Sequence, residues 1–218
     1  MTINNNLIKR YMLFITGLFI AALGVAFSTK AGLGTSPVAS VPYSVSLLSG
    51  LLTFGGWLNM WSLIQITVQV ILLRKNCNPI EIIIQTVLAF VYGYLTNFAC
   101  YILSGLKVEG YISQLICMFT GCFVLALGIW IQLKGNVAML PGEAMNRAIS
   151  TVTGKRYENI KIFFDVLYIL ISVIIGLCFL GRLEGVREGS IIAAVLIGSI
   201  IKGYNKIWDK VVRKNTNL

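Results

Sequence analysis

The chain has 218 residues and a net charge of +10, with 57% hydrophobic and only 12% charged residues. Soluble domains carry about twice that share of charge, so the composition excludes an ordinary soluble domain and indicates an all-α protein embedded in lipid. The positive charge does not indicate a nucleic-acid partner, because the basic residues flank apolar runs and form no patch interleaved with aromatic residues. The absence of histidine excludes a histidine relay, a haem ligand and most zinc sites, and no cofactor or metal is expected.

Long uncharged runs divide the chain into segments that can cross a membrane. Nineteen uncharged residues separate Arg10 from Lys30, and twenty-five separate Glu81 from Lys107. A helix needs about 20 apolar residues to cross the hydrocarbon core of a bilayer. In chain order, spanning helices are predicted near residues 11–29, 56–73, 82–104, 111–133, 160–180 and 188–208.

The first predicted helix and the segment after it recur in the second half of the chain. Residues 14–50 align with residues 118–154 without a gap, and ten of the thirty-seven positions are identical. Further along, residues 85–97 align with residues 193–205 after an insertion of four residues. Internal similarity of this length indicates a duplicated structural unit. The sequence therefore predicts two membrane repeats, residues 1–105 and 106–218, each with three spanning helices and one further segment.

Glycines that match between the repeats lie seven residues apart in the first helix of each. They are Gly17 and Gly24 in the first copy, and Gly121 and Gly128 in the second. This spacing places each pair on one helix face, and small residues on a face let two helix backbones approach closely in lipid. We therefore expect these glycines to form a packing seam that holds the two repeats together.

In each repeat, the segment between the first and second spanning helices fits a bilayer poorly. These segments, residues 35–54 and 139–155, follow small, flexible stretches and start their helices at Pro37 and Pro141, a position that proline favours. The second segment carries Glu143 and Arg147, each of which costs about 2.5–3.5 kcal/mol at the centre of a spanning helix. We expect it to lie at the interface or to enter the membrane partway as a short re-entrant helix.

Two topologies remain open. If neither short segment spans, the chain crosses six times and the repeats are inverted; if both span, it crosses eight times and the repeats are parallel. With Arg147 left aside as buried, six crossings place thirteen Lys and Arg residues inside and four outside, against eleven and six for eight crossings. Cytoplasmic loops carry an excess of basic residues, so six crossings are preferred. Both termini are then cytoplasmic, together with the basic residues near them: Lys9, Arg10, Lys202, Lys206, Lys210, Arg213 and Lys214.

Two glycine-containing motifs resemble those of a known family. The first helix has the pattern G-x-x-x-x-A-x-G-[VI] and runs into a polar L-G-T-S-P turn, and the last helix carries G-T/S-x-I-x-A-x-x-x-G. Both patterns resemble the YczE/YyaS/YitT family of bacterial integral membrane proteins. The matching residues are Gly17, Ala22, Gly24, Val25, Leu33, Gly34, Thr35, Ser36 and Pro37, then Gly189, Ser190, Ile192, Ala194 and Gly198. The resemblance implies a multi-pass plasma-membrane protein for which transport is suspected, with no general substrate or catalytic residues to transfer.

Candidate functional residues gather at the two short segments and at the helix after the second. Many transporters build their sites from broken or half-inserted helices at the interface of inverted repeats, with helix N-termini facing an anionic group. An ionisable residue within such a protein is a functional hypothesis by default. The predicted substrate pathway comprises Thr35, Ser36, Glu143, Asn146, Arg147 and Asp165.

The chemistry of these residues favours a small anion or zwitterion. Arg147 and the hydroxyl groups near Pro37 would bind it, and Glu143 or Asp165 would carry a coupling proton. Glu143 and Arg147 are spaced i, i+4, so their side chains can meet; the alternative is that they form a purely structural ion cluster with Asp165, or that their helix faces water at the interface. Six embedded carboxamides are expected to join helices by hydrogen bonds rather than to line a pathway: Asn59, Gln65, Gln69, Gln85, Asn97 and Gln132.

The predicted function is secondary transport of a small anionic or zwitterionic solute through a site at the repeat interface. The alternative is a membrane accessory or regulatory protein without flux, in which the polar helix is a docking surface. An enzyme is not expected, since the chain has no histidine, no paired catalytic carboxylates and no GxSxG motif. The expected partners are the lipid bilayer and a small-molecule solute, and the oligomeric state is left open.

Overall fold

A computed structural model describes residues 5–74, 77–135, 137–181 and 185–216; for residues 5–7, 209 and 211–216 it describes the backbone only. The side chains of Arg213 and Lys214 thus lie outside the described part. The helices are α1 (Asn5–Ala31), α2 (Pro37–Leu48), α3 (Phe54–Leu73), α4 (Pro79–Ile102), α5 (Tyr111–Gly135), α6 (Pro141–Thr153), α7 (Tyr157–Ile175) and α8 (Glu188–Thr216). A short 3₁₀ turn, η2 (Leu103–Gly105), follows α4, and a π-helical turn, η3 (Gly176–Leu180), continues α7. The described residues contain no strand.

Six of the described helices are long and apolar enough to cross a membrane: α1, α3, α4, α5, α7 and α8. They lie where the uncharged runs predict them, with ends that differ by a few residues. The two short segments form separate helices, α2 of 12 residues and α6 of 13. At 1.5 Å per residue these helices are about 18–20 Å long, whereas the hydrocarbon core is about 30 Å thick.

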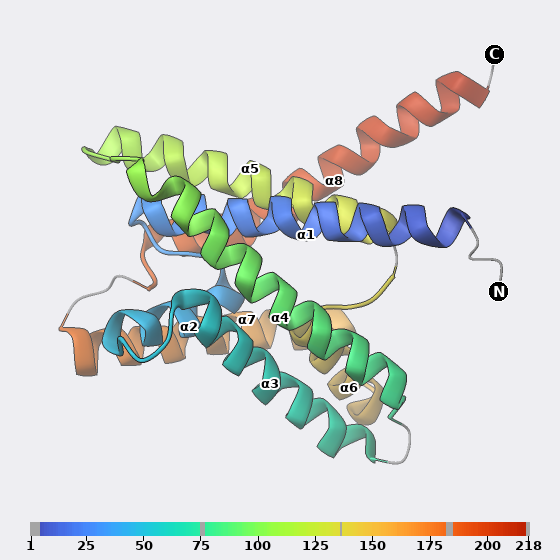
Figure 1. Ribbon diagram of the computed structural model, residues 1–218, viewed down its shortest axis with the longest axis horizontal. Helices are drawn as coiled ribbons and strands as arrows, with labels where there is room; N and C mark the ends of the chain where they lie inside the picture. The colour runs from blue at the N-terminus through green and yellow to red at the C-terminus, as the bar shows by residue number, and fades with distance from the viewer. Residues whose placement is uncertain (1–4, 75–76, 136, 182–184, 217–218) are drawn as a thin grey trace.

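The helices form two groups that α4 connects (Figure 1). One group is α1, α5 and α8, in which α5 packs against both of the others. The second group contains α2, α3, α6 and α7, in which α2 packs against α7 and α6 against α3. The α4 helix contacts α1 on one side and α3 on the other. Each short helix therefore packs against a long helix from the other half of the chain.

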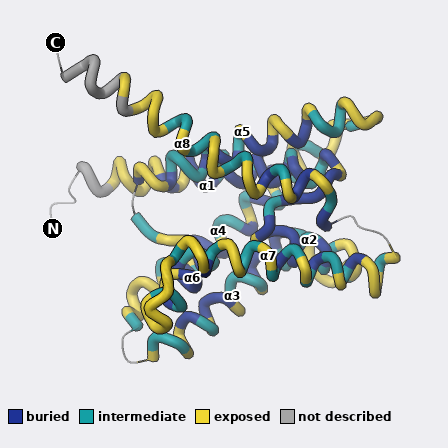
Figure 2. Tube along the Cα trace, turned by 180° about the vertical axis from the view of Figure 1, so that it is seen from behind, coloured by how far each residue is buried: buried dark blue, intermediate teal, exposed yellow. Residues whose placement is uncertain are grey.

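The buried and exposed residues follow this arrangement (Figure 2). Buried residues gather where α1 meets α5, while exposed residues recur along α7 and α8. Large apolar side chains on these two helices are more than half exposed, among them Phe163, Leu170 and Val195. In water such a surface would be an aggregation hazard, but in a bilayer it is the surface that contacts lipid.

The close packing predicted for the glycines of α1 and α5 is confirmed. The most extensive helix contact in the described residues joins α1 to α5, and the two helices run in opposite directions. A Cβ atom at Gly24 would overlap the Leu125 backbone, and one at Gly128 would overlap the Ala21 backbone. The absence of a side chain at these positions is what allows the two backbones to approach so closely.

Candidate functional site

A cavity of about 1070 Å³ lies between the two helix groups, with walls from all eight helices and from residues 137–140. On the α1, α5 and α8 side its walls are mainly apolar, with alanine, valine, leucine and isoleucine side chains. On the α3, α4, α6 and α7 side they include most of the polar and charged groups. Those groups are Gln69, Glu81, Gln85, Glu143, Asn146, Arg147, Thr151, Tyr157, Lys161, Asp165 and Tyr168. The cavity therefore has one mainly apolar wall and one wall that carries most of the polar and charged groups.

Five of the six residues predicted to form a substrate pathway line this cavity: Ser36, Glu143, Asn146, Arg147 and Asp165. They come from three helices or their first turns, namely α2, α6 and α7. Thr35 lies outside this lining; its side chain is 1% exposed. The structure thus brings together residues that lie 129 positions apart in the sequence, from Ser36 to Asp165.

The α6 helix supplies three of these residues because its two faces differ. It starts at Pro141 and ends before Gly154, which has the positive φ of 67° typical of a residue that stops a helix. Ala144, Met145 and Ala148 are buried. The two charged side chains, at positions i and i+4, lie on the face that borders the cavity.

The charged groups share the cavity without forming close pairs. Glu143 and Arg147, whose spacing allows their side chains to meet, form no ion pair within 4 Å, and neither does Asp165 with Arg147; both statements concern described residues only. The Arg147 guanidinium instead donates to the Met139 sulfur at 3.6 Å. Asp165 lies within electrostatic range of Lys161 and Glu143. The described charges of the cavity are therefore not paired directly as in a structural ion cluster, and Arg147, which the count of basic residues set aside as buried, is exposed.

Three buried carboxamides border the cavity with an oxygen that accepts no hydrogen bond from the described residues. They belong to Gln69 of α3, Gln85 of α4 and Asn146 of α6, and each residue is only 4% exposed. A buried polar atom without a partner costs about 1–3 kcal/mol, and beside a cavity the partner can be an ordered water or a ligand. We refer to these three residues as the carboxamide triad.

The expectation that embedded carboxamides join helices holds for only some of them. The Gln65 amide donates to the Tyr168 hydroxyl at 3.2 Å, and that of Gln132 donates to the Gly17 carbonyl at 3.2 Å. The side-chain oxygens of Gln69 and Gln85 accept no hydrogen bond from the described residues. For these two oxygens the expectation that embedded carboxamides join helices is wrong. The sequence around these four glutamines does not show which of them form hydrogen bonds between helices, since all four lie inside apolar runs.

Substitutions of Gln85, whose oxygen has no hydrogen-bond partner, and of Gln65, which bonds to Tyr168, should change the free energy of unfolding in opposite directions. Replacing Gln85 by leucine should raise the free energy of unfolding by about 1–3 kcal/mol, because an unsatisfied buried oxygen is removed. The matched change Gln65→Leu should lower it, because the Tyr168 hydroxyl loses its hydrogen-bond partner. Thermal unfolding of the two variants in one detergent measures both. Equal destabilisation by the two changes would contradict a ligand-facing Gln85.

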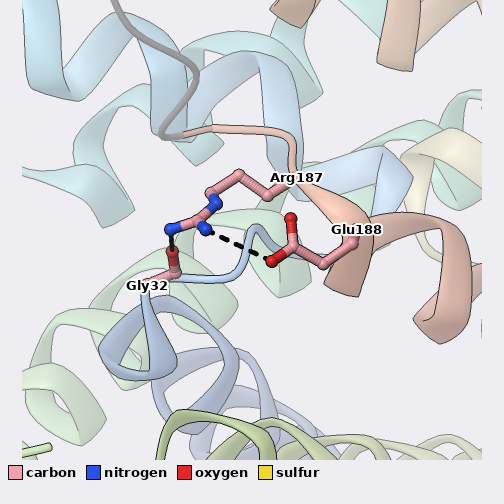
Figure 3. A network of polar contacts seen from close by, with 3 residues as sticks. All are labelled: Gly32, Arg187 and Glu188. Carbon is pink, nitrogen blue, oxygen red and sulfur yellow. Dashed lines mark hydrogen bonds and ion pairs between the residues drawn. The ribbon is translucent and has the colours of Figure 1, made fainter. Parts of the chain in front are cut away.

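At the other end of α7, the polar turn after α1 is tied to the start of α8 (Figure 3). The Arg187 guanidinium donates to the Gly32 carbonyl at 3.1 Å and pairs with the Glu188 carboxylate at 3.2 Å. The Gly189 amide donates to the Leu33 carbonyl at 3.0 Å. We call this contact between residues 32–34 and 186–190 the loop clamp. It joins the two motifs that carry the family resemblance.

Close packing at the loop clamp explains why position 34 is a glycine, and two hydroxyl groups are buried nearby. Gly34 has a φ of 95°, and a Cβ atom there would overlap the Ser190 hydroxyl. The hydroxyls of Thr35 and Ser190 are fully buried and have no hydrogen-bond partner among the described residues. Thr35 directly follows the clamp, is 1% exposed and does not line the cavity.

Comparison with known proteins extends over nearly the whole chain. Residues 8–206 match the model of a family described as "Family of unknown function (DUF6198)". The chain is also 25% identical over 166 residues to the protein named "Uncharacterized protein YyaS" from Bacillus subtilis (strain 168), which covers 76% of this chain and 80% of that protein. No solved structure matches.

These matches bear out the resemblance to YyaS, whereas the wider grouping with YczE and YitT remains a prediction. The family match takes in α1, the loop clamp and most of α8, where both sequence motifs lie. With six apolar helices long enough to cross a membrane, the protein is compatible with a membrane-embedded fold. The chain belongs to the family of unknown function DUF6198.

Proposed function

We propose that the protein is a secondary transporter of a small anionic or zwitterionic solute in the plasma membrane, with its binding site in the cavity between the two helix groups. The observation that carries the proposal is the carboxamide triad beside Arg147, Glu143 and Asp165. Buried unpartnered oxygens and unpaired charges of both signs in one cavity are the features expected of a site for a charged solute. This arrangement would bind an ammonium through the carboxamide and carboxylate oxygens and an anionic group through Arg147.

Inverted repeats with six crossings are part of this proposal. The antiparallel pairing of α1 with α5 supports it, because these are the matched first helices of the two sequence repeats. Two further pairs of contacts are related in the same way, since α2 packs on α7 as α6 packs on α3, and α1 packs on α4 as α5 packs on α8. The units 1–105 and 106–218 then each supply three spans and one re-entrant helix, and the cavity lies between them.

This topology, with both termini cytoplasmic, places the two ends of the cavity on opposite sides of the membrane. The first turn of α7 and the charged face of α6 lie on the cytoplasmic side, and the loop clamp lies outside. We infer that the loop clamp, none of whose residues lines the cavity itself, closes the outer end in the described conformation. A carrier that alternates between two open states needs such a closure that can be broken and remade.

Thiol labelling tests the topology directly. Cys77, between α3 and α4, should be labelled only from the cytoplasmic side in a variant from which the other four cysteines have been removed. In a cysteine-free background, Glu109→Cys, between α4 and α5, should be labelled only from outside. An impermeant maleimide applied to intact cells and to inverted vesicles gives both answers. The eight-crossing topology predicts the reverse pattern at both positions.

Breaking the loop clamp should open the outer end. Arg187→Ala removes the hydrogen bond to Gly32 and the ion pair with Glu188, and hydrogen bonds to charged groups contribute about 1.5–3 kcal/mol. A single cysteine placed at Ser36, in the cavity wall, should then react roughly tenfold faster with an external reagent. The control is Lys107→Ala, an exposed basic residue between η2 and α5. Equal rates in both variants would rule out the clamp as a gate.

Reconstitution into liposomes tests transport itself. The purified protein should support saturable uptake of at least one labelled amino acid, betaine or small carboxylate, with and without an imposed pH gradient, above the level of protein-free liposomes. If the folded protein moves none of these solutes, the accessory or regulatory role becomes the better explanation. In that case the charged face of α6 is a docking surface.

A further inference from the structure

The two halves differ in how their last two helices meet. In the first half, α3 and α4 pack closely, because Gly55 and Gly93 lie against each other and a Cβ atom on either would overlap the other helix. Asn97 of α4 locks this contact: its amide donates to the Thr53 hydroxyl at 2.8 Å, and its oxygen accepts from the Gly55 amide at 2.8 Å. Within the described residues no comparable contact joins α7 to α8.

The repeat alignment explains this difference. The counterpart of Gly93 is Ile201, whose side chain prevents the close approach that glycine allows in the first half. The counterpart of Asn97 is Asn205, which accepts a hydrogen bond from the indole of Trp130 on α5 at 3.0 Å. The α8 helix is therefore held by α5 and stands apart from α7. We call the resulting gap between α7 and α8 the lateral opening.

The lateral opening has unlike walls. On the α7 side, Lys161, Asp165 and Tyr168 line the cavity. On the α8 side the lining is entirely apolar, from Ala193, Ala194, Ile197, Gly198 and Ile201. A Cβ atom at Gly198 would meet no heavy atom within 4 Å, so this wall has open space in front of it.

The size of the cavity also exceeds what a small polar solute needs. Sites for drug-sized ligands have volumes of about 300–1,000 Å³, and this cavity has about 1070 Å³. A small anion or zwitterion bound at the carboxamide triad and Arg147 would leave the α8 wall uncovered. An apolar group on the same solute would cover it, and the burial of that group would add to the affinity.

We propose that the solute is an amphipath: the primary ammonium of a zwitterionic head group donates to the carboxamide triad, its anionic group binds Arg147, and an apolar chain lies along the α8 wall towards the lateral opening. This inference rests on the proposed function, since it names the class of solute that the same cavity would take. The chain leaves or enters through the gap between α7 and α8, where it would pass directly into the bilayer.

A homologous series tests the inference. Straight-chain α-amino acids with two to eight side-chain carbons, which carry a primary ammonium and a carboxylate, are titrated by calorimetry into the protein in lipid nanodiscs, with empty nanodiscs subtracted and without detergent, which is itself an amphipath. Affinity should rise about fourfold per added methylene group, because each buried CH₂ contributes about 0.8 kcal/mol. It should level off once the chain has covered the α8 wall.

Two variants of α8 locate the chain. Gly198→Leu fills the space in front of the α8 wall, so it should abolish the increase in affinity with chain length. The affinity for the shortest member should stay within about twofold of the wild-type value. Gly203→Leu is the matched control, because a Cβ atom there also meets nothing within 4 Å but the residue does not line the cavity. The Gly203→Leu variant should keep the wild-type increase in affinity per methylene group.

The outcomes separate the two proposals. If the shortest members bind but the wild-type series is flat, or if both variants keep the slope, the amphipathic solute is ruled out while the transporter proposal stands. If no member binds at all, the binding site itself is wrong. Repeating the series in nanodiscs with phosphatidylethanolamine and in nanodiscs with phosphatidylglycerol distinguishes the source: weaker binding of the amino acids with phosphatidylethanolamine, whose head group has a primary ammonium, identifies a bilayer lipid as the competing occupant, and equal binding identifies a free amphipath.

Discussion

Replacing Arg147 by alanine is expected to reduce uptake of an anionic or zwitterionic solute by about ten- to a hundredfold. The guanidinium lines the cavity, pairs with no carboxylate among the described residues and has only the Met139 sulfur as a hydrogen-bond partner. A charged hydrogen bond to the solute would contribute about 1.5–3 kcal/mol, which corresponds to this range of affinity. Initial rates in proteoliposomes, measured over a range of solute concentrations, give the change.

Three further substitutions test the assignment of the site. Arg147→Lys keeps the charge but not the planar fork, so it should retain part of the activity. Arg156→Ala removes an exposed basic residue from the nearby connection between α6 and α7, outside the cavity wall, and should leave uptake unchanged. Glu143→Gln should reduce the stimulation of uptake by a pH gradient if this carboxylate carries the coupling proton. Wild-type flux in both Arg147→Ala and Glu143→Gln would show that the site assignment is wrong.

The second large effect concerns the glycine seam. Gly24→Ala should lower the free energy of unfolding by about 3 kcal/mol and the Tm by about 6–12 °C, because the added methyl group overlaps the Leu125 backbone and not a movable side chain. The larger change Gly24→Leu should leave little folded protein. Fluorescence-detected size-exclusion chromatography after heating measures both. As a control, Gly203→Ala adds the same methyl group where no heavy atom lies within 4 Å, and should be neutral or slightly stabilising.

Local sequence patterns were sufficient to predict the helices and the glycine seam between α1 and α5. The uncharged runs located the six long helices because lipid demands about 20 apolar residues per crossing. The spacing of Gly17, Gly24, Gly121 and Gly128 predicted the α1–α5 contact, because in lipid only small residues allow backbones to come so close. Pro37 and Pro141 marked the starts of α2 and α6, because proline suits the first turn of a helix.

The candidate site was predicted only in part. Charge within an apolar context identified Glu143, Arg147 and Asp165, and all three line the cavity. The ion pair expected from the i, i+4 spacing is absent, because the Arg147 side chain turns towards Met139. Sequence spacing states which side chains can reach each other, whereas the actual partner depends on what the neighbouring loop presents.

The sequence by itself determined the long apolar helices, the glycine seam and the charged short helix, and it predicted a membrane protein with a duplicated unit. These features follow from composition, period and spacing, which act along the chain. Only the tertiary structure decided which buried groups lack partners: Gln65 is satisfied by Tyr168, while Gln69 and Gln85 face the cavity. It also brought the two glycine-containing motifs together at Arg187 and held α8 apart from α7. The physical reason is that hydrogen-bond satisfaction and cavities depend on contacts between residues more than a hundred positions apart, which no local pattern records.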